Sequence, residues 1–83
     1  MNIDLLIKMA NEISAFFDGE ESDPVRAQQA VAAHLIRFWA PPMRAQIVAY
    51  LEQRQGGGLS DTARAAVTLL ARAPAAAAEA RPE

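Results

Sequence analysis

Few residues of this chain are of types that do chemistry, and their spacing limits what that chemistry can be. The only histidine is His34, which lies between Val31 and Phe38 on the apolar side of a predicted helix. A nucleophile needs a base beside it, and the base needs a group that orients it. Because the sequence offers no such set around His34, we expect a histidine packed in a core or in a protein interface.

Two other stretches have the composition of ligand-binding loops but not their spacing. An EF-hand that begins at Asp18 needs glycine at its sixth position and glutamate at its twelfth, where this chain has Asp23 and Gln29. A phosphate loop built on glycines 56–58 needs Lys-Ser or Lys-Thr after it, and Leu-Ser-Asp follows instead. We therefore interpret the first stretch as a solvated linker and the second as a helix–helix connection.

The composition excludes further classes of site. The chain has no cysteine, so it has neither a disulfide nor a thiolate for zinc or an iron–sulfur cluster. The formal net charge is −2 and the arginines are scattered, which disfavours nucleic-acid binding. No stretch approaches the length of a membrane span, and the start lacks the basic residues of a signal peptide. We expect a soluble, cytoplasmic protein without catalytic, cofactor-binding or metal-binding residues.

Hydrophobic periodicity predicts an all-α fold, a small bundle of three to four short helices. The helices are expected at about 3–17, 24–38 and 42–54, with a short fourth helix after Ser60. Asp23 before a proline and Ser60 are predicted N-caps, and Gly19 is the predicted left-handed residue after the first helix. We expect a helical domain at 1–72 and an Ala/Pro-rich, mobile tail at 73–83.

Each predicted helix has an apolar stripe, and the first stripe is wider than the roughly 100° of a simple surface helix. That width predicts that the first helix packs against more than one neighbouring element. Alanine makes up much of the 52% hydrophobic content, so large apolar side chains are few and a partner surface is expected to complete the fold. The stripes are Leu6, Met9, Ala10, Ile13, Phe16 and Phe17; Ala27, Val31, His34, Leu35 and Phe38; Met43, Ile47, Tyr50 and Leu51; and Leu59, Ala63, Ala66 and Leu70.

The corner around Trp39 is the predicted partner site. Trp39 lies about 100° past Phe38 on the second helix and so off the centre of its stripe, beside two stiff prolines. Tryptophan and arginine are enriched at binding hot spots, and Arg37 and Arg44 flank this corner. Phe16 and Phe38, by contrast, are expected in the core. The residues predicted to contact a partner are Phe17, His34, Arg37, Trp39, Met43 and Arg44.

Three blocks of the sequence, in this order and at this spacing, form a pattern specific enough to compare with a known family. They are residues 7–13 running into a double phenylalanine at 16–17, residues 34–44 with the pattern Phe-Trp-x-Pro-x-Met-Arg, and Gly-Leu-Ser at 58–60. Together they resemble the delta subunit of the NAD-dependent, molybdenum-containing formate dehydrogenases, over about residues 3–70. The chain departs from the expected pattern at Ala40, Pro42 and Asp61.

This resemblance implies an accessory, non-catalytic subunit. In such a complex a large alpha subunit oxidises formate at a molybdenum cofactor, and electrons pass through iron–sulfur clusters to FMN and NAD in other subunits. The resemblance implies that this chain binds the large subunit and supports assembly, stability or cofactor loading. The alternative is a free-standing helical adaptor or regulator, for instance a homodimer, unrelated to formate. A small enzyme is a third class, disfavoured because no acid–base pair or metal set exists.

Overall fold

Four helices make up the part of the chain that the structure describes. It is a computed structural model, and it describes the backbone of residues 2–80 and the side chains of residues 2–72. The helices are α1 (Ile3–Glu20), α2 (Pro24–Phe38), α3 (Pro41–Arg54) and α4 (Asp61–Ala80). No strand occurs between residues 2 and 80, so the predicted all-α fold is confirmed.

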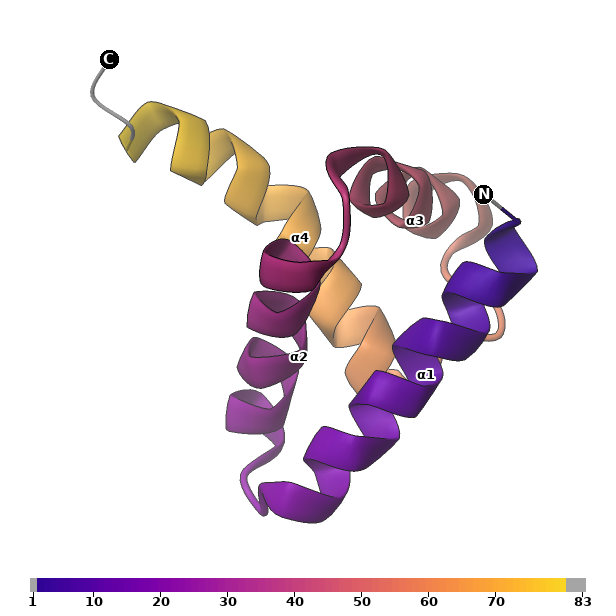
Figure 1. Cartoon of the computed structure of the whole chain (residues 1–83), viewed down its shortest axis with the longest axis vertical. Helices are drawn as coiled ribbons and strands as arrows, with labels where there is room; N and C mark the ends of the chain where they lie inside the picture. Colours follow the sequence, from indigo (N-terminus) through magenta and orange to yellow (C-terminus); the bar gives the residue numbers. More distant parts are fainter. Residues whose placement is uncertain (1, 81–83) are drawn as a thin grey trace.

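The helices are arranged around α4. In Figure 1, α1 and α2 diverge from the turn that joins them, α3 lies across the open end between them, and α4 runs behind α1 and α2. Helix α4 contacts each of the other helices, and most extensively α2. This arrangement leaves one side of α1 and one side of α2 turned away from α4, on the face seen in Figure 1.

The starts of α2 and α4 are fixed by the capping residues that the sequence indicates. The Asp23 carboxylate accepts a hydrogen bond from the backbone N–H of Val25 at 3.0 Å. The Ser60 hydroxyl accepts one from the N–H of Ala63 at 3.2 Å. Both groups satisfy N–H groups that the first turn of a helix leaves without an intrahelical partner. Both predicted N-caps are thus confirmed.

Two helix ends differ from the prediction. Helix α1 continues through Gly19 to Glu20, so Gly19 is not a left-handed terminator; the cap is Glu21, whose N–H donates to the Phe17 carbonyl at 2.8 Å. Helix α3 begins at Pro41, one residue earlier than expected. Both differences follow from the backbone: glycine is tolerated inside a helix, and a proline costs no hydrogen bond in the first turn.

Helix α4 is longer than the short fourth helix that the sequence predicts, since it continues to Ala80. The predicted boundary between a domain at 1–72 and a tail at 73–83 stays a prediction. It falls where the side chains, and beyond Ala80 the backbone too, lie outside the described residues.

The core lies where α4 meets the other helices. Ile47 is the buried residue of α3, and the stripe predicted for the fourth helix is buried throughout, together with Val67. Met43, Tyr50 and Leu51 pack against the core from its edge. The hydrophobic cluster consists of Leu6, Ala10, Val31, Ala32, Leu35, Trp39, Ile47, Leu59, Ala63, Ala66, Val67 and Leu70.

The predicted placement of the aromatic side chains is wrong at three positions. Trp39 is 5% exposed and belongs to the core, whereas Phe16 and Phe38 are 61% and 65% exposed. The buried side of α2 includes Ala32, which the predicted stripe does not contain. Trp39 comes seven residues after Ala32, about two turns later, and so lies on the same side of the helix. Phe38 therefore lies at the edge of the buried side, and Trp39 lies within it.

The connection between α3 and α4 is held by a side chain of α1. Gln55, Gly56 and Gly58 have positive φ angles, a conformation that glycine adopts without steric cost. The Asn11 side-chain amide donates to the Gly58 carbonyl at 2.9 Å, and its oxygen accepts from the N–H of Ser60 at 2.8 Å. The predicted helix–helix connection is therefore an ordered turn fixed against α1.

Candidate protein-binding surface

An aromatic cluster lies on the outer side of α1 and α2. The rings of Phe16 and Phe17 are 5.2 Å apart, those of Phe17 and His34 are 6.0 Å apart, and those of His34 and Phe38 are 4.7 Å apart. The first two pairs are edge-to-face, an arrangement that aromatic rings favour. We call this surface the aromatic face; it consists of Phe16, Phe17, His34 and Phe38.

The aromatic face continues along α1 as a row of apolar side chains. Leu5 is 44% exposed, Met9 and Ile13 are half-buried, and Phe16 ends the row. These residues follow at about one-turn intervals beside the buried row of Leu6, Ala10 and Ser14. Helix α1 thus has two apolar rows. The first is fully buried, whereas the outer row is only partly covered, with Met9 and Ile13 packed against the core and Leu5 and Phe16 exposed. The extra width of its apolar face, noted in the sequence, is this outer row.

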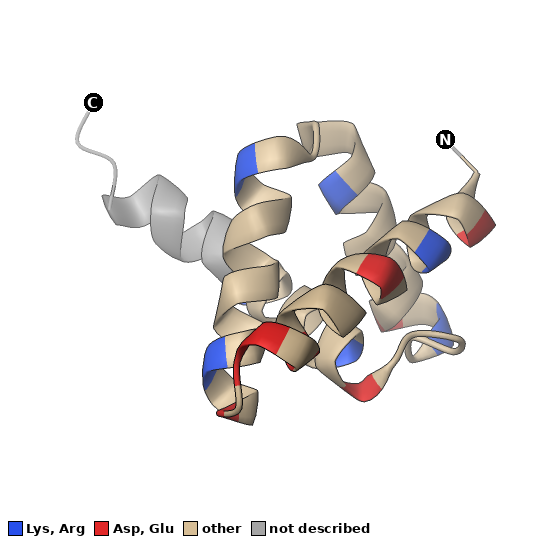
Figure 2. Cartoon of the chain, turned by 60° about the horizontal axis from the view of Figure 1, so that its bottom comes forward, with Lys and Arg blue, Asp and Glu red and all other residues tan. Residues whose placement is uncertain are grey.

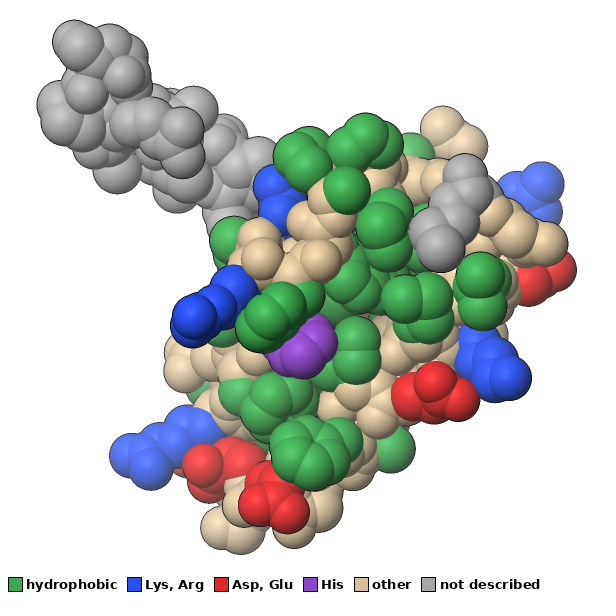
Figure 3. All heavy atoms as spheres, viewed as in Figure 1, with side chains coloured by type: hydrophobic (Ala, Val, Ile, Leu, Met, Phe, Trp, Pro, Cys, Tyr) green, Lys and Arg blue, Asp and Glu red, His purple; other side chains and the backbone are tan. Residues whose placement is uncertain are grey.

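Charged side chains surround the aromatic face rather than interrupt it. Figure 3 shows the histidine among hydrophobic side chains on the α1–α2 side, with charged side chains towards the edges of the view. In Figure 2 acidic residues gather where α1 meets α2, and a basic residue lies at the far end of α2. The acidic residues around that turn are Asp18, Glu20, Glu21 and Asp23. An apolar centre with a polar rim is the usual anatomy of a protein–protein interface.

Arg37 marks the opposite end of the aromatic face from the acidic turn. Its guanidinium carbon lies 5.5 Å from the centre of the Phe38 ring, within the range of a cation–π contact. The side chain is exposed. Arg37 therefore presents a positive charge directly beside an exposed ring.

Arg44, a predicted partner contact, uses its guanidinium within the chain. One of its terminal nitrogens donates to the carbonyls of Ile36 at 2.6 Å and of Trp39 at 2.9 Å. These carbonyls lie at the end of α2, where the helix leaves them without intrahelical partners. Arg44 thus caps α2 from α3 and joins the two helices.

The predicted partner residues fall into two places. Phe17, His34 and Arg37 lie together on or beside the aromatic face. Trp39 is buried, and Met43 packs half-buried against the core, so both belong with Arg44 to the joint between α2 and α3.

Two surface residues, Phe16 and Phe38, are missing from the sequence prediction. A signal for Phe16 exists in the sequence, because it shares its side of the helix with Leu5 and Met9, away from Leu6 and Ala10. For Phe38 the signal is indirect. Ala32 and Trp39 are seven residues apart and so share one side of α2; if that side is the buried one, Phe38 lies at its edge.

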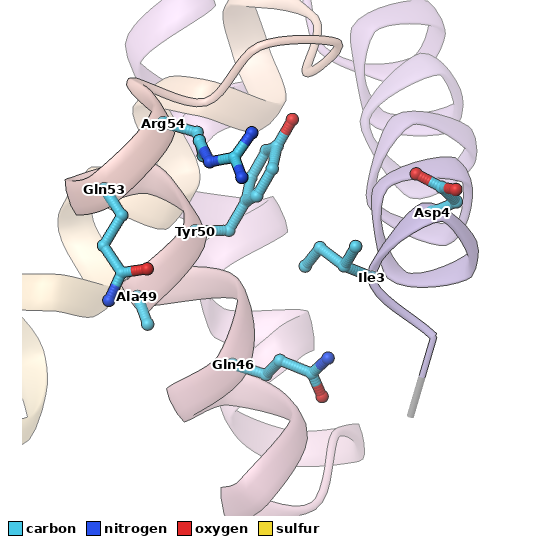
Figure 4. Close-up of a pocket in the computed structure, with 7 residues that line it drawn as sticks. All are labelled: Ile3, Asp4, Gln46, Ala49, Tyr50, Gln53 and Arg54. Carbon is cyan, nitrogen blue, oxygen red and sulfur yellow. The ribbon is translucent and has the colours of Figure 1, made fainter.

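A second feature, an open depression of about 420 Å³, lies between the start of α1 and α3. Figure 4 shows Asp4 on α1 and Arg54 on α3 at its margins, with Tyr50 between the helices. The Tyr50 hydroxyl donates to the Gly57 carbonyl and thereby holds the α3–α4 connection. The lining contains no nucleophile with a base beside it. It comprises Ile3, Asp4, Gln46, Ala49, Tyr50, Gln53 and Arg54.

The described residues provide neither a metal-binding cluster nor a membrane-spanning helix. No three His, Cys, Asp or Glu side chains there come together in a way that could hold a metal ion. None of the helices, over the same residues, has the length and apolar character needed to cross a membrane.

Comparison with known proteins assigns the family. The model of the NADH-dependent formate dehydrogenase delta subunit, FdsD, matches residues 5–67, which is most of the chain. The chain belongs to this delta-subunit family. The resemblance carried by the three sequence blocks is therefore confirmed. Searches among curated proteins and among solved structures found no match.

The sequence blocks that carry the family resemblance meet in the fold of this delta subunit. Asn11 from the first block binds Gly58 and Ser60 of the third. Within the second block, Arg44 binds the carbonyl of Trp39. These blocks thus build the joints between helices, while the aromatic face uses their outward-facing phenylalanines and histidine.

Proposed function

We propose that this delta subunit is a non-catalytic accessory component of a cytoplasmic, molybdenum-containing formate dehydrogenase, and that it binds the large alpha subunit. Its work is to support assembly, stability or cofactor loading of that subunit. The observation that carries the proposal is the aromatic face, a solvent-exposed apolar surface on a chain of the delta-subunit family.

The exposed rings support a binding role on energetic grounds. Leaving two phenylalanines largely in water forgoes about 1.5–3 kcal/mol of burial for each ring. A chain of 83 residues with few large apolar side chains gains by burying those two in its own core. That they lie outside, with charges only around them, favours a partner that covers them.

In this proposal the redox cofactors belong to other subunits. The molybdenum cofactor, the iron–sulfur clusters, FMN and NAD are held elsewhere in the complex, and this chain supplies only protein contacts. The absence of cysteine supports this division, because thiolates are the usual ligands of iron–sulfur clusters.

Co-purification with the alpha subunit tests the proposal. The tagged, full-length chain is produced together with the alpha subunit, and the alpha subunit is also produced alone. We expect a stoichiometric complex, and an alpha subunit that melts at lower temperature or contains less molybdenum when this chain is omitted. Failure of the alpha subunit to co-purify would overturn the proposal, as would formate oxidation by this chain alone.

A further inference from the structure

We infer that the aromatic face receives one amphipathic helix of the large subunit, held in a single orientation by charges at its two ends. The helix carries a basic side chain over Glu20 and an acidic side chain beside Arg37. This inference rests on the proposed function and adds to it the place, the kind of element and its direction.

The outer row of α1 has the geometry that receives a helix. Leu5, Met9, Ile13 and Phe16 form a ridge that runs for about 17 Å along the helix axis, at 1.5 Å per residue. Such ridges fit into the grooves between the side-chain rows of a second helix. On the other side of the same surface, His34 and Phe38 of α2 supply a second row. A single helix placed over these rows contacts both α1 and α2.

The charges at the two ends of this surface are opposite. Glu20 follows Phe16 by one turn and so continues the outer row of α1 into the acidic turn. Arg37 lies near the C-terminus of α2, about 20 Å from that turn at the helical rise per residue. In the described part of the chain neither side chain has a carboxylate or guanidinium partner within ion-pair distance. Both are therefore available to complementary charges on an occupant.

A second copy of this chain is the competing occupant, and the crosslinking below distinguishes it from a helix of the large subunit. Its aromatic face presents the same protruding rings of Phe16 and Phe38, so two copies set rings against rings. A single helix can instead place small side chains opposite each ring, which permits ridges-into-grooves contact.

Site-specific photo-crosslinking identifies the occupant. A p-benzoylphenylalanine is introduced at Phe16 or at Phe38 of the full chain, which is then bound to the large subunit and irradiated. We expect both positions to crosslink to one apolar helical segment of the large subunit. A basic residue is expected near the attachment point of position 16, and an acidic residue near that of position 38. The same probe at the exposed Glu52 of α3 is the control and should not reach that segment.

Charge reversal tests the orientation. Arg37→Glu and Glu20→Arg are each expected to weaken binding to the large subunit about fivefold at low salt, the scale of one exposed ion pair replaced by a repulsion. The loss should shrink as added salt screens the charges. The controls, Arg54→Glu and Glu52→Arg, make the same charge changes on exposed residues of α3 and should bind as the wild type does.

Each outcome bears on one claim. If the wild-type chain binds the large subunit but the probes at 16 and 38 do not crosslink to it, the inference is wrong and the proposed function stands. Crosslinks between two copies of this chain would also overturn the inference. If the wild-type chain does not bind the large subunit, the proposed function fails and the inference fails with it.

Discussion

Two neighbouring aromatic residues of this delta subunit have opposite surroundings. Trp39 is almost completely buried in the joint between α2 and α3, whereas Phe38, the residue before it, is 65% exposed on the aromatic face. Each has an arginine beside it: Arg44 binds the Trp39 carbonyl, and Arg37 lies over the Phe38 ring. Helix α2 ends between the two residues, and its last turn directs one inward and the other outward.

This contrast shows that one block of the family resemblance contributes both to the core and to the exposed surface. Trp39 and Arg44 belong to the most specific block of the family resemblance, and both are engaged within the chain. Phe38 belongs to the same block and Phe16 to the first block, yet both of these side chains are exposed. A specific motif can thus reflect the needs of the fold, and a binding surface can consist of residues that sequence patterns assign to the core.

Truncation of Trp39 should have the largest effect on stability. Trp39→Ala removes a fully packed indole from the core, so we expect a loss of about 3–5 kcal/mol in the free energy of unfolding. Urea denaturation followed by circular dichroism measures this loss. The matched control is Phe38→Ala, which should cost less than about 1 kcal/mol because most of that ring is already in water.

Fluorescence gives an independent check on the same comparison. Trp39 is the only tryptophan, so its emission reports on this joint alone. We expect a blue-shifted spectrum that is little quenched by acrylamide in the folded chain. A spectrum like that of free tryptophan, with Trp39→Ala as stable as the wild type, would place Trp39 on the surface.

Arg44 is expected to have the next largest effect. Arg44→Ala removes the donors to two carbonyls at the end of α2, and we expect a loss of about 1–2 kcal/mol in unfolding free energy. Arg44→Lys keeps the charge but loses the planar group that reaches both carbonyls, and should lie between the alanine variant and the wild type. If Arg44→Ala weakens partner binding without any loss of stability, Arg44 acts at the interface instead.

Asn11, like Arg44, joins two elements by side-chain hydrogen bonds to backbone groups: it links α1 to the α3–α4 connection. Asn11→Ala removes both hydrogen bonds to the α3–α4 connection, and we expect a loss of about 1 kcal/mol because water replaces part of these exposed bonds. Amide hydrogen exchange should speed up at Ser60, whose N–H loses its partner. Unchanged exchange at Ser60 would show that the turn is held by other contacts.

Ser14 should show the smallest effect, and in the opposite direction. Its hydroxyl is fully buried and has no hydrogen-bond partner among the residues that the structure describes. Ser14→Ala removes an unsatisfied polar group and favours helix, so the unfolding free energy should stay equal or rise by up to about 1 kcal/mol. A clear loss of stability on chemical denaturation would mean that the hydroxyl has a partner.

Much of the fold follows from local sequence signals. Asp23 and Ser60 cap helices where their side chains predict it, and the stripe of Leu59, Ala63, Ala66 and Leu70 is buried as its spacing predicts. These features depend on residues within a turn or two of one another. The end of α1 at Glu20 was less predictable, since Gly19 stays inside the helix.

The candidate surface was only partly predictable, because burial depends on how helices are placed around one another. Helix α1 has two apolar rows, and the positions of α2, α3 and α4 around it decide how far each row is covered. On α2, the stripe that includes His34 and Phe38 and the one that includes Ala32 and Trp39 are both compatible with the helical period. The hydrogen bonds of Asn11 and Arg44 join residues of different elements, which no local pattern specifies.

The most direct test of this account is the affinity of the double variant Phe16→Ala/Phe38→Ala for the large subunit, measured beside its unfolding free energy. We expect binding to weaken about 30-fold or more, the usual scale of an interface hot spot, while the stability changes by less than about 2 kcal/mol. Wild-type affinity in this folded variant would contradict the claim that the aromatic face is the binding surface.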